Sequence, residues 1–335
     1  MQQSEQHPYK TWIDLAAARL GAQALECSDD FFAEMENLLK PADPVFIAGK
    51  FTDRGQWMDG WESRRKRVVG HDWCVIKLGA KGIIHGLNVC TTHFAGNAPQ
   101  KVSVEGCVSS DAPNADTKWV EVLSLSDVQP DSDNFFDIET NEAITHLRLN
   151  IFPDGGVARL RVYGEPVIDW NWFLPGEPVD LAYVKNGGRP LEASDMFFSN
   201  PENLVMPNRG ANMGDGWETK RRRGGRVCDW AILKLGVLGN IQKVVVDTAH
   251  FKGNFPESFS LQAIKLPAGE HPTEDSAWVD VIERQKLTAD AEHFYKEEVK
   301  TGDEEFTHVR VNMFPDGGIS RLRVIGFPNK DVAGK

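Results

Sequence analysis

The sequence lacks the features that mark several large classes of protein. Its 335 residues include only 5 cysteines, an odd number without Cys-x-x-Cys spacing, which argues against a disulfide framework and a zinc site. No apolar run approaches the length of a membrane span, and the N-terminal MQQSEQHPYK lacks the apolar core of a secretory signal. HExxH, GxSxG, P-loop and GxGxxG motifs are absent. We expect a cytoplasmic protein with reduced thiols, no membrane partner and no cofactor, with a divalent metal held by distant side chains as an open alternative.

Positive charge is also scarce. The chain has 37 Lys and Arg against 49 Asp and Glu, a net charge of −12, which argues against nucleic acid as a partner. The basic residues nonetheless cluster, as RRKR at 64–67 and KRRR at 220–223. In an acidic protein such clusters indicate a local pocket for a small anion.

The chain does contain a long internal repeat, in which one sequence unit occurs twice. Asp-Gly-Trp-Glu occurs at 59–62 and 215–218, His-Phe-x-Gly-Asn at 93–97 and 250–254, and Phe-Pro-Asp-Gly-Gly at 152–156 and 314–318. The period of about 160 residues is too long for a solenoid, so each copy is a whole domain. We predict a first domain at 11–168, a linker at 169–179 and a second domain at 180–330.

Strand patterns dominate both copies. Short β-branched segments separated by Gly, Pro or Asn occur at 74–78, 83–89, 102–107, 119–123, 146–152 and 157–162. The Ala- and Leu-rich segment 13–25 suggests a helix by itself, but its counterpart at 181–192 contains Gly-Gly and Pro, so we expect at most a short turn. The pattern predicts two all-β domains of the sandwich or jelly-roll type.

One predicted hairpin gathers several polar side chains. Alternation places His146, Arg148 and Asn150 on one face of a strand, and Arg159 and Arg161 alternate in the same way after a Pro-Asp-Gly-Gly turn. The second copy repeats the set with His308, Arg310, Asn312, Arg321 and Arg323. Arginine presents a planar fork that matches a carboxylate or a urea-like oxygen, although a solvated outer face is an equal alternative.

A glutamate stands between tryptophan and arginine in both copies of the opening motif. Strand geometry places Glu62 on the face opposite Trp61 and Arg65, and neighbouring cations would keep the carboxylate ionised, as suits a hydrogen-bond acceptor or a base. Glu218 and Arg221 repeat the arrangement. A structural ion pair is the alternative.

A histidine occupies the end of a strand in each copy, just before a loop. His93 precedes Asn97, and His250 precedes Asn254, in segments that present side chains. Both histidines are candidates for a general acid or base, with a structural role as the alternative.

Taken in their order, these motifs resemble the allantoicase family. The resemblance runs from about Trp12 to Phe327 and rests on GWESRRKR and GWETKRRR, DWCVIKLG and DWAILKLG, THFAGN and DTAHFKGN, and both FPDGG segments. It implies two jelly-roll domains of the galactose-binding-like type in a homo-oligomeric hydrolase, which cleaves a C–N bond of allantoate, a small anionic ureide, to give ureidoglycolate and urea. Another ureide or amidine hydrolase, or a jelly-roll module that only binds a ligand, is the alternative.

The residues fit this chemistry, with arginines for the carboxylate and asparagines for the ureido oxygens. The catalytic candidates are Glu62, His93, Glu218 and His250. The substrate-binding candidates are Arg65, Asn97, Arg148, Asn150, Arg161, Arg221, Asn254, Arg310, Asn312 and Arg323. The first copy has Cys90 where the second has Asp247, which leaves open whether both copies are competent.

Overall fold

The computed structural model describes residues 9, 12–225 and 227–329, which fall into two compact units, Met1–Val167 and Ile168–Lys335. Within the described residues both units are built from strands and short 3-10 turns, without an α-helix. No helix of this part of the chain is long and apolar enough to cross a membrane.

The strands of the first unit are β1 (Ile13–Asp14), β2 (Gln23–Cys27), β3 (Phe51–Thr52), β4 (Gly55–Gln56), β5 (Trp61–Glu62), β6 (Asp72–Cys90), β7 (Lys101–Cys107), β8 (Val120–Asp127), β9 (Asp133–Asp137), β10 (Ile144–Phe152), β11 (Gly156–Val157) and β12 (Arg159–Pro166). The strands of the second unit are β13 (Val179–Asp180), β14 (Arg189–Ala193), β15 (Trp217–Glu218), β16 (Asp229–Asp247), β17 (Ser258–Ile264), β18 (Val279–Lys286), β19 (Glu292–Tyr295), β20 (Glu305–Phe314), β21 (Gly318–Ile319) and β22 (Arg321–Pro328). The 3-10 turns are η1 (Ala18–Leu20), η2 (Met35–Leu39), η3 (Trp170–Trp172), η4 (Val184–Asn186), η5 (Pro201–Val205) and η6 (Met213–Asp215).

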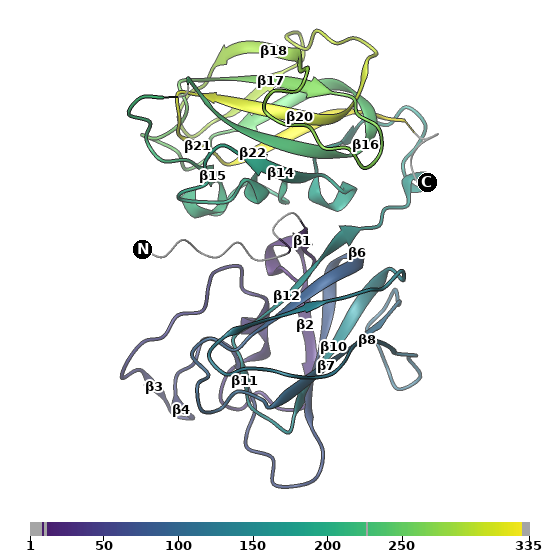
Figure 1. Ribbon diagram of the computed structural model, residues 1–335, viewed down its shortest axis with the longest axis vertical. Coiled ribbons are helices and arrows are strands. Elements are labelled where there is room, and N and C mark those ends of the chain that lie inside the picture. Colours follow the sequence, from purple (N-terminus) through teal and green to yellow (C-terminus); the bar gives the residue numbers. More distant parts are fainter. Residues whose placement is uncertain (1–8, 10–11, 226, 330–335) are drawn as a thin grey trace. The chain divides into compact units, whose positions relative to one another are not determined.

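The long strand β6 organises the first unit. Its first part pairs with β2 and β10, and its second part pairs with β12 and β9, so one strand enters both layers of a jelly-roll sandwich. Figure 1 shows β10, β7 and β8 side by side, and β16 takes the place of β6 in the second unit. The two segments predicted at 74–78 and 83–89 are therefore a single strand.

Alternation decides what each layer buries. Leu147, Leu149 and Ile151 of β10 are completely buried, as are Trp61 and Trp217 of the duplicated motif. The predicted all-β architecture is confirmed, and the three-residue turn η1 is the only helical element of the segment at 13–25.

The predicted hairpin between 146–152 and 157–162 is wrong. β10 pairs with β6 and β7, whereas β12 pairs with β1 and the second part of β6, so Arg148 and Arg161 belong to different layers. The segment between the strands does not fold back on β10, because Gly156 and Val157 pair with β5 instead. His146 and His308, expected on a polar face, are 1% and 4% exposed.

Candidate active site

Three duplicated motifs converge on one cavity in each unit. In the first unit a cavity of about 600 Å³ is lined by Phe32 and by residues of the segments 62–67, 96–100 and 153–155. In the second unit a cavity of about 700 Å³ is lined by Phe198 and by residues of the segments 218–221, 253–257, 286–287 and 315–317. Segments that lie far apart in the chain thus build equivalent sites.

Main-chain contacts hold the three segments together in the first unit. The Ser63 main-chain nitrogen donates to the Gly155 carbonyl at 3.1 Å, and the Gly156 nitrogen donates to the Asn97 carbonyl at 2.8 Å. The Lys66 nitrogen donates to Oδ2 of Asp154 at 2.8 Å. A Cβ atom on Gly155, where φ is +135°, would lie 2.5 Å from the Asn97 carbonyl oxygen. The Asp-Gly-Gly sequence therefore serves close packing of three loops, which explains why it does not form the predicted hairpin turn.

The second unit repeats these contacts. The Thr219 nitrogen donates to the Gly317 carbonyl at 3.0 Å, and the Gly318 nitrogen donates to the Asn254 carbonyl at 2.9 Å. The Arg222 nitrogen donates to Oδ2 of Asp316 at 2.7 Å.

A carboxyl–amide pair lies in each cavity. Nδ2 of Asn97 donates to Oε1 of Glu62 at 2.7 Å, and Nδ2 of Asn254 donates to Oε1 of Glu218 at 2.6 Å. Burial raises the pKa of Glu62, and the hydrogen bond from Asn97 opposes that rise only in part. The expectation that neighbouring cations govern the ionisation of Glu62 is therefore wrong, because desolvation is the larger influence. A carboxyl group with a raised pKa is suited to donating a proton.

Positive charge lines the same walls. Arg65 borders the cavity with Glu62, and Arg221 borders the other with Glu218. The predicted placement of Arg65 on the opposite face is wrong because β5 ends at Glu62, so strand alternation stops there. Lys286 adds a cation to the second cavity.

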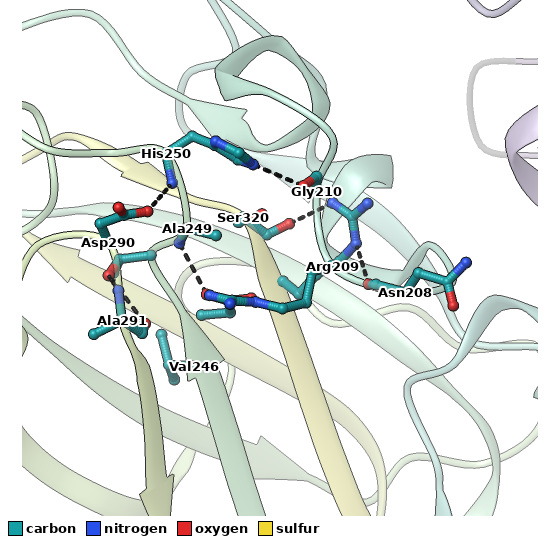
Figure 2. Close-up of polar contacts among 12 residues, drawn as sticks. Asn208, Arg209, Gly210, Val246, Ala249, His250, Asp290, Ala291 and Ser320 are labelled. Atoms are coloured by element: carbon teal, nitrogen blue, oxygen red, sulfur yellow. Dashed lines mark hydrogen bonds and ion pairs between the residues drawn. The ribbon is translucent and has the colours of Figure 1, made fainter.

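Neither histidine candidate is among the residues that line these cavities. The main-chain nitrogen of His250 donates to Oδ1 of Asp290 at 2.7 Å, and its Nε2 lies 2.8 Å from the Gly210 carbonyl oxygen (Figure 2). His93 makes the same contacts with Asp131, at 2.7 Å, and with the Pro44 carbonyl, at 3.2 Å. Each histidine has a positive φ, 71° for His93 and 70° for His250. This geometry is that of a clamp between loops.

Four other candidates form polar networks on β10 and β20. Arg148 pairs with Glu105 at 2.7 Å and lies over the ring of Trp119, and Asn150 donates to the same carboxylate at 3.0 Å. Arg310 and Asn312 make the equivalent contacts with Gln262, and Arg310 lies over Trp278. None of the four borders the glutamate cavities.

The last two candidates lie on β12 and β22. Arg161 is 3.5 Å from Oδ2 of Asp14, and Arg323 is 3.7 Å from Oδ2 of Asp180. Arg323 borders a separate cavity of the second unit. The structure thus brings Glu62, Arg65 and Asn97 together, and likewise Glu218, Arg221 and Asn254, and it places the other candidates elsewhere.

Comparison with known proteins gives the family. The allantoicase repeat matches the chain twice, over residues 13–167 and 179–329. The chain belongs to the allantoicase family. A probable allantoicase of Burkholderia mallei is 47% identical over 325 residues, covering 96% of each chain, and one of Acinetobacter baylyi is 47% identical over 316 residues, covering 93% of each. The crystal structure of allantoicase from Saccharomyces cerevisiae has 35% identity and a TM-score of 0.80, covering 94% of this chain and 93% of that one. The resemblance inferred from the sequence is confirmed.

Sequence analysis missed two kinds of residue that line these cavities. The motif predicts a turn role for Asp154 and Asp316, although their duplication beside the other motifs also indicates a shared site. Gln100 and Glu257 occupy equivalent places but differ in type, so no repeated pattern marked them. Among the described residues, no group of three or more His, Cys, Asp or Glu side chains is placed to hold a metal ion.

Proposed function

We propose that this chain hydrolyses allantoate to ureidoglycolate and urea, and that the two glutamate cavities are its sites. The observation that carries the proposal is the convergence of a half-buried carboxyl, an amide and an arginine in both repeats. Cys90 and Asp247, which distinguish the repeats, do not line these cavities. We therefore propose that both repeats are competent.

The substrate has groups that match these walls. Allantoate carries one carboxylate and two ureido groups on a single carbon atom. Arg65 or Arg221 can bind the carboxylate through its planar fork. The amide of Asn97 or Asn254 offers a donor and an acceptor to a ureido group.

Glutamate supplies the proton transfers in this mechanism. Protonated Glu62 gives its proton to the ureido nitrogen that departs, and the C–N bonding electrons leave with urea. The lone pair of the remaining ureido nitrogen supports the electron-poor central carbon. The carboxylate of Glu62 then removes a proton from water as its oxygen bonds to that carbon, which forms ureidoglycolate and restores the acid. The raised pKa of Glu62 favours the protonated starting form.

The test is urea release from allantoate by the purified protein, with and without a chelator. We expect release in both conditions, because the proposal needs no metal. Each single variant, Glu62→Gln or Glu218→Gln, should lose the activity of one site, and the double variant should lose about 100-fold or more. Glu105→Gln is the matched control, since Glu105 pairs with Arg148 away from the cavities.

The possible results separate site from function. Full urea release by the double variant would reject the glutamate sites but not the activity. No urea from allantoate with the unaltered protein would reject the activity. We further propose a cytoplasmic homo-oligomer, which sedimentation of the purified protein and fractionation of cells would test.

A further inference from the structure

The second repeat contains another cavity, which shares no residue with the Glu218 cavity. Its volume is about 370 Å³. Its polar walls come from β13 and the residue Tyr183 just before η4, from β16, β19 and β22, and from the loop that follows η5. They include Asp180, Tyr183, Arg209, Asp247, Arg321 and Arg323. Figure 2 shows this loop, with Asn208, Arg209 and Gly210. None of these residues takes part in the reaction proposed above.

One wall of this cavity contains a two-bond ion pair. Arg209 donates two hydrogen bonds to the carboxylate of Asp247, from Nε at 2.8 Å and from Nη2 at 2.9 Å. Asp247 is 2% exposed, and a buried carboxylate held in this way cannot turn without losing its partner. This ion pair therefore fixes the orientation of one carboxylate in the wall of the cavity.

One donor in this pattern is unused. Nη2 of Arg323 donates to the carbonyls of Met206, at 2.6 Å, and Asn208, at 2.9 Å. Nη1 of the same guanidinium is buried and makes no hydrogen bond to any residue in the described part of the chain. It lies 3.7 Å from Oδ2 of Asp180, too far for a hydrogen bond. A buried donor without a hydrogen-bond partner costs free energy, and a ligand would recover it once the adjoining wall shifts to expose this nitrogen.

Charge and spacing define the ligand. Three arginines (209, 321 and 323) and three acids (Asp180, Asp247 and Glu292) line the cavity, so their formal charges cancel. This balance favours a neutral polar ligand over a free anion. The donor, Nη1 of Arg323, lies beside an acceptor, Oδ2 of Asp180. This pair matches a planar group that has a carbonyl oxygen next to an N–H.

We propose that this cavity binds a neutral ureido group, one per chain. The choice of a ureide over another amide rests on the proposed function, which releases urea. The first repeat has Ala17, Asp43 and Cys90 at the positions of Tyr183, Arg209 and Asp247. The forked ion pair and the aromatic wall are therefore special to the second repeat.

The test observes Tyr183 directly. The chain has 4 tyrosines, so fluorotyrosine labelling gives a simple fluorine NMR spectrum, in which Tyr183→Phe assigns the resonance of interest. Urea, ureidoacetate and acetate are titrated into the Glu62→Gln/Glu218→Gln double variant, which stops turnover. We expect urea to move the Tyr183 resonance saturably, at concentrations well below those that unfold the protein, and acetate to leave it in place. Ureidoacetate reports whether a ureido group joined to a carboxylate also enters, and Tyr9, Tyr163 and Tyr295 correct for bulk solvent effects.

A matched pair of variants locates the site. Arg323→Lys should weaken urea binding about tenfold, the loss of one well-formed hydrogen bond to a charged donor. Arg161→Lys, the same change in the first repeat, should leave it unchanged. Should Arg323→Lys fail to fold, Arg209→Met, which removes the partner of Asp247, replaces it. An unmoved Tyr183 resonance, an equal response to acetate, or equal binding by the Arg323 and Arg161 variants would overturn the proposal. Urea release by the unaltered protein is measured separately, so failure of the catalytic proposal is seen independently.

Discussion

Asn97 donates a hydrogen bond of 2.7 Å to Glu62, and Asn254 donates one of 2.6 Å to Glu218. The partners are 35 residues apart in the first repeat and 36 in the second. Each pair therefore joins two of the duplicated motifs at the wall of a cavity. The amide fixes one carboxyl oxygen and limits how far burial raises the pKa of Glu62.

Removal of this amide should move the pH profile of the reaction. In a Glu218→Gln background only the first site turns over, and Asn97→Ala then removes the hydrogen bond that stabilises the carboxylate of Glu62. The pKa of Glu62 should rise further, so the limb of the kcat/KM profile that reports Glu62 should move to higher pH. Urea release measured across the pH range checks this shift. Asn150→Ala, on β10, is the control, and a limb that stays still or moves to lower pH contradicts the assignment.

The sequence contained enough information for the architecture but not for the pairing of its strands. Duplication and alternation predicted two all-β domains, and this prediction is confirmed. Alternation defines the faces of one strand only. It cannot choose the neighbouring strand, so Arg148 and Arg161 were placed together although they lie in different layers.

The cavity illustrates a second limit of sequence analysis. The motif places Glu62 and Arg65 close in sequence, but strand alternation predicted opposite faces for them because it cannot show that β5 ends at Glu62. The contact of Glu62 with Asn97 depends on tertiary packing. The pKa of Glu62 depends on desolvation, which sequence neighbours do not reveal. Likewise, the positive φ of His93 and the contact of its imidazole with the Pro44 carbonyl show a clamp only once the loops are placed.

Gly155→Ala should destabilise the first repeat. The residue has φ +135°, and an added Cβ would lie 2.5 Å from the Asn97 carbonyl oxygen, so the loop that carries Asn97 must shift. We expect a loss of about 2 kcal/mol in the free energy of unfolding. We also expect lower activity of the first site, measured in a Glu218→Gln background.

Gly96→Ala provides the comparison for this change. Gly96 borders the same cavity, but an added Cβ would meet no atom within 4 Å. Its effect on unfolding should stay within about 0.5 kcal/mol. Equal melting temperatures for the two variants would show that the close approach at Gly155 does not constrain the loop.

His250→Asn should reduce stability more than catalysis. Asparagine tolerates the positive φ of 70° but cannot reproduce the contact of the imidazole with the Gly210 carbonyl. We measure activity in a Glu62→Gln background, where only the second site turns over. There we expect a lower melting temperature and a fall in kcat/KM of less than about tenfold, against 100-fold or more for removal of an acid–base group. His93→Asn should behave in the same way in a Glu218→Gln background. A loss of 100-fold or more in kcat at an unchanged melting temperature would assign His250 a catalytic role.

Acid should destabilise the second repeat through His308. Burial lowers the pKa of His308 to about 4, whereas an unfolded histidine titrates near 6.5. Between these values the unfolded chain binds more protons, so this contribution to stability is fully present above pH 6.5 and is lost as the pH falls toward 4. At pH 5 the loss should be about 2 kcal/mol relative to pH 7. Asp180, whose pKa burial raises to about 6, acts in the opposite direction but is common to the proteins compared.

The measurement compares the unaltered chain with His308→Asn. The free energy of unfolding of the unaltered chain minus that of His308→Asn should fall by about 2 kcal/mol between pH 7 and pH 5. A flat difference would mean that His308 ionises freely in the folded state.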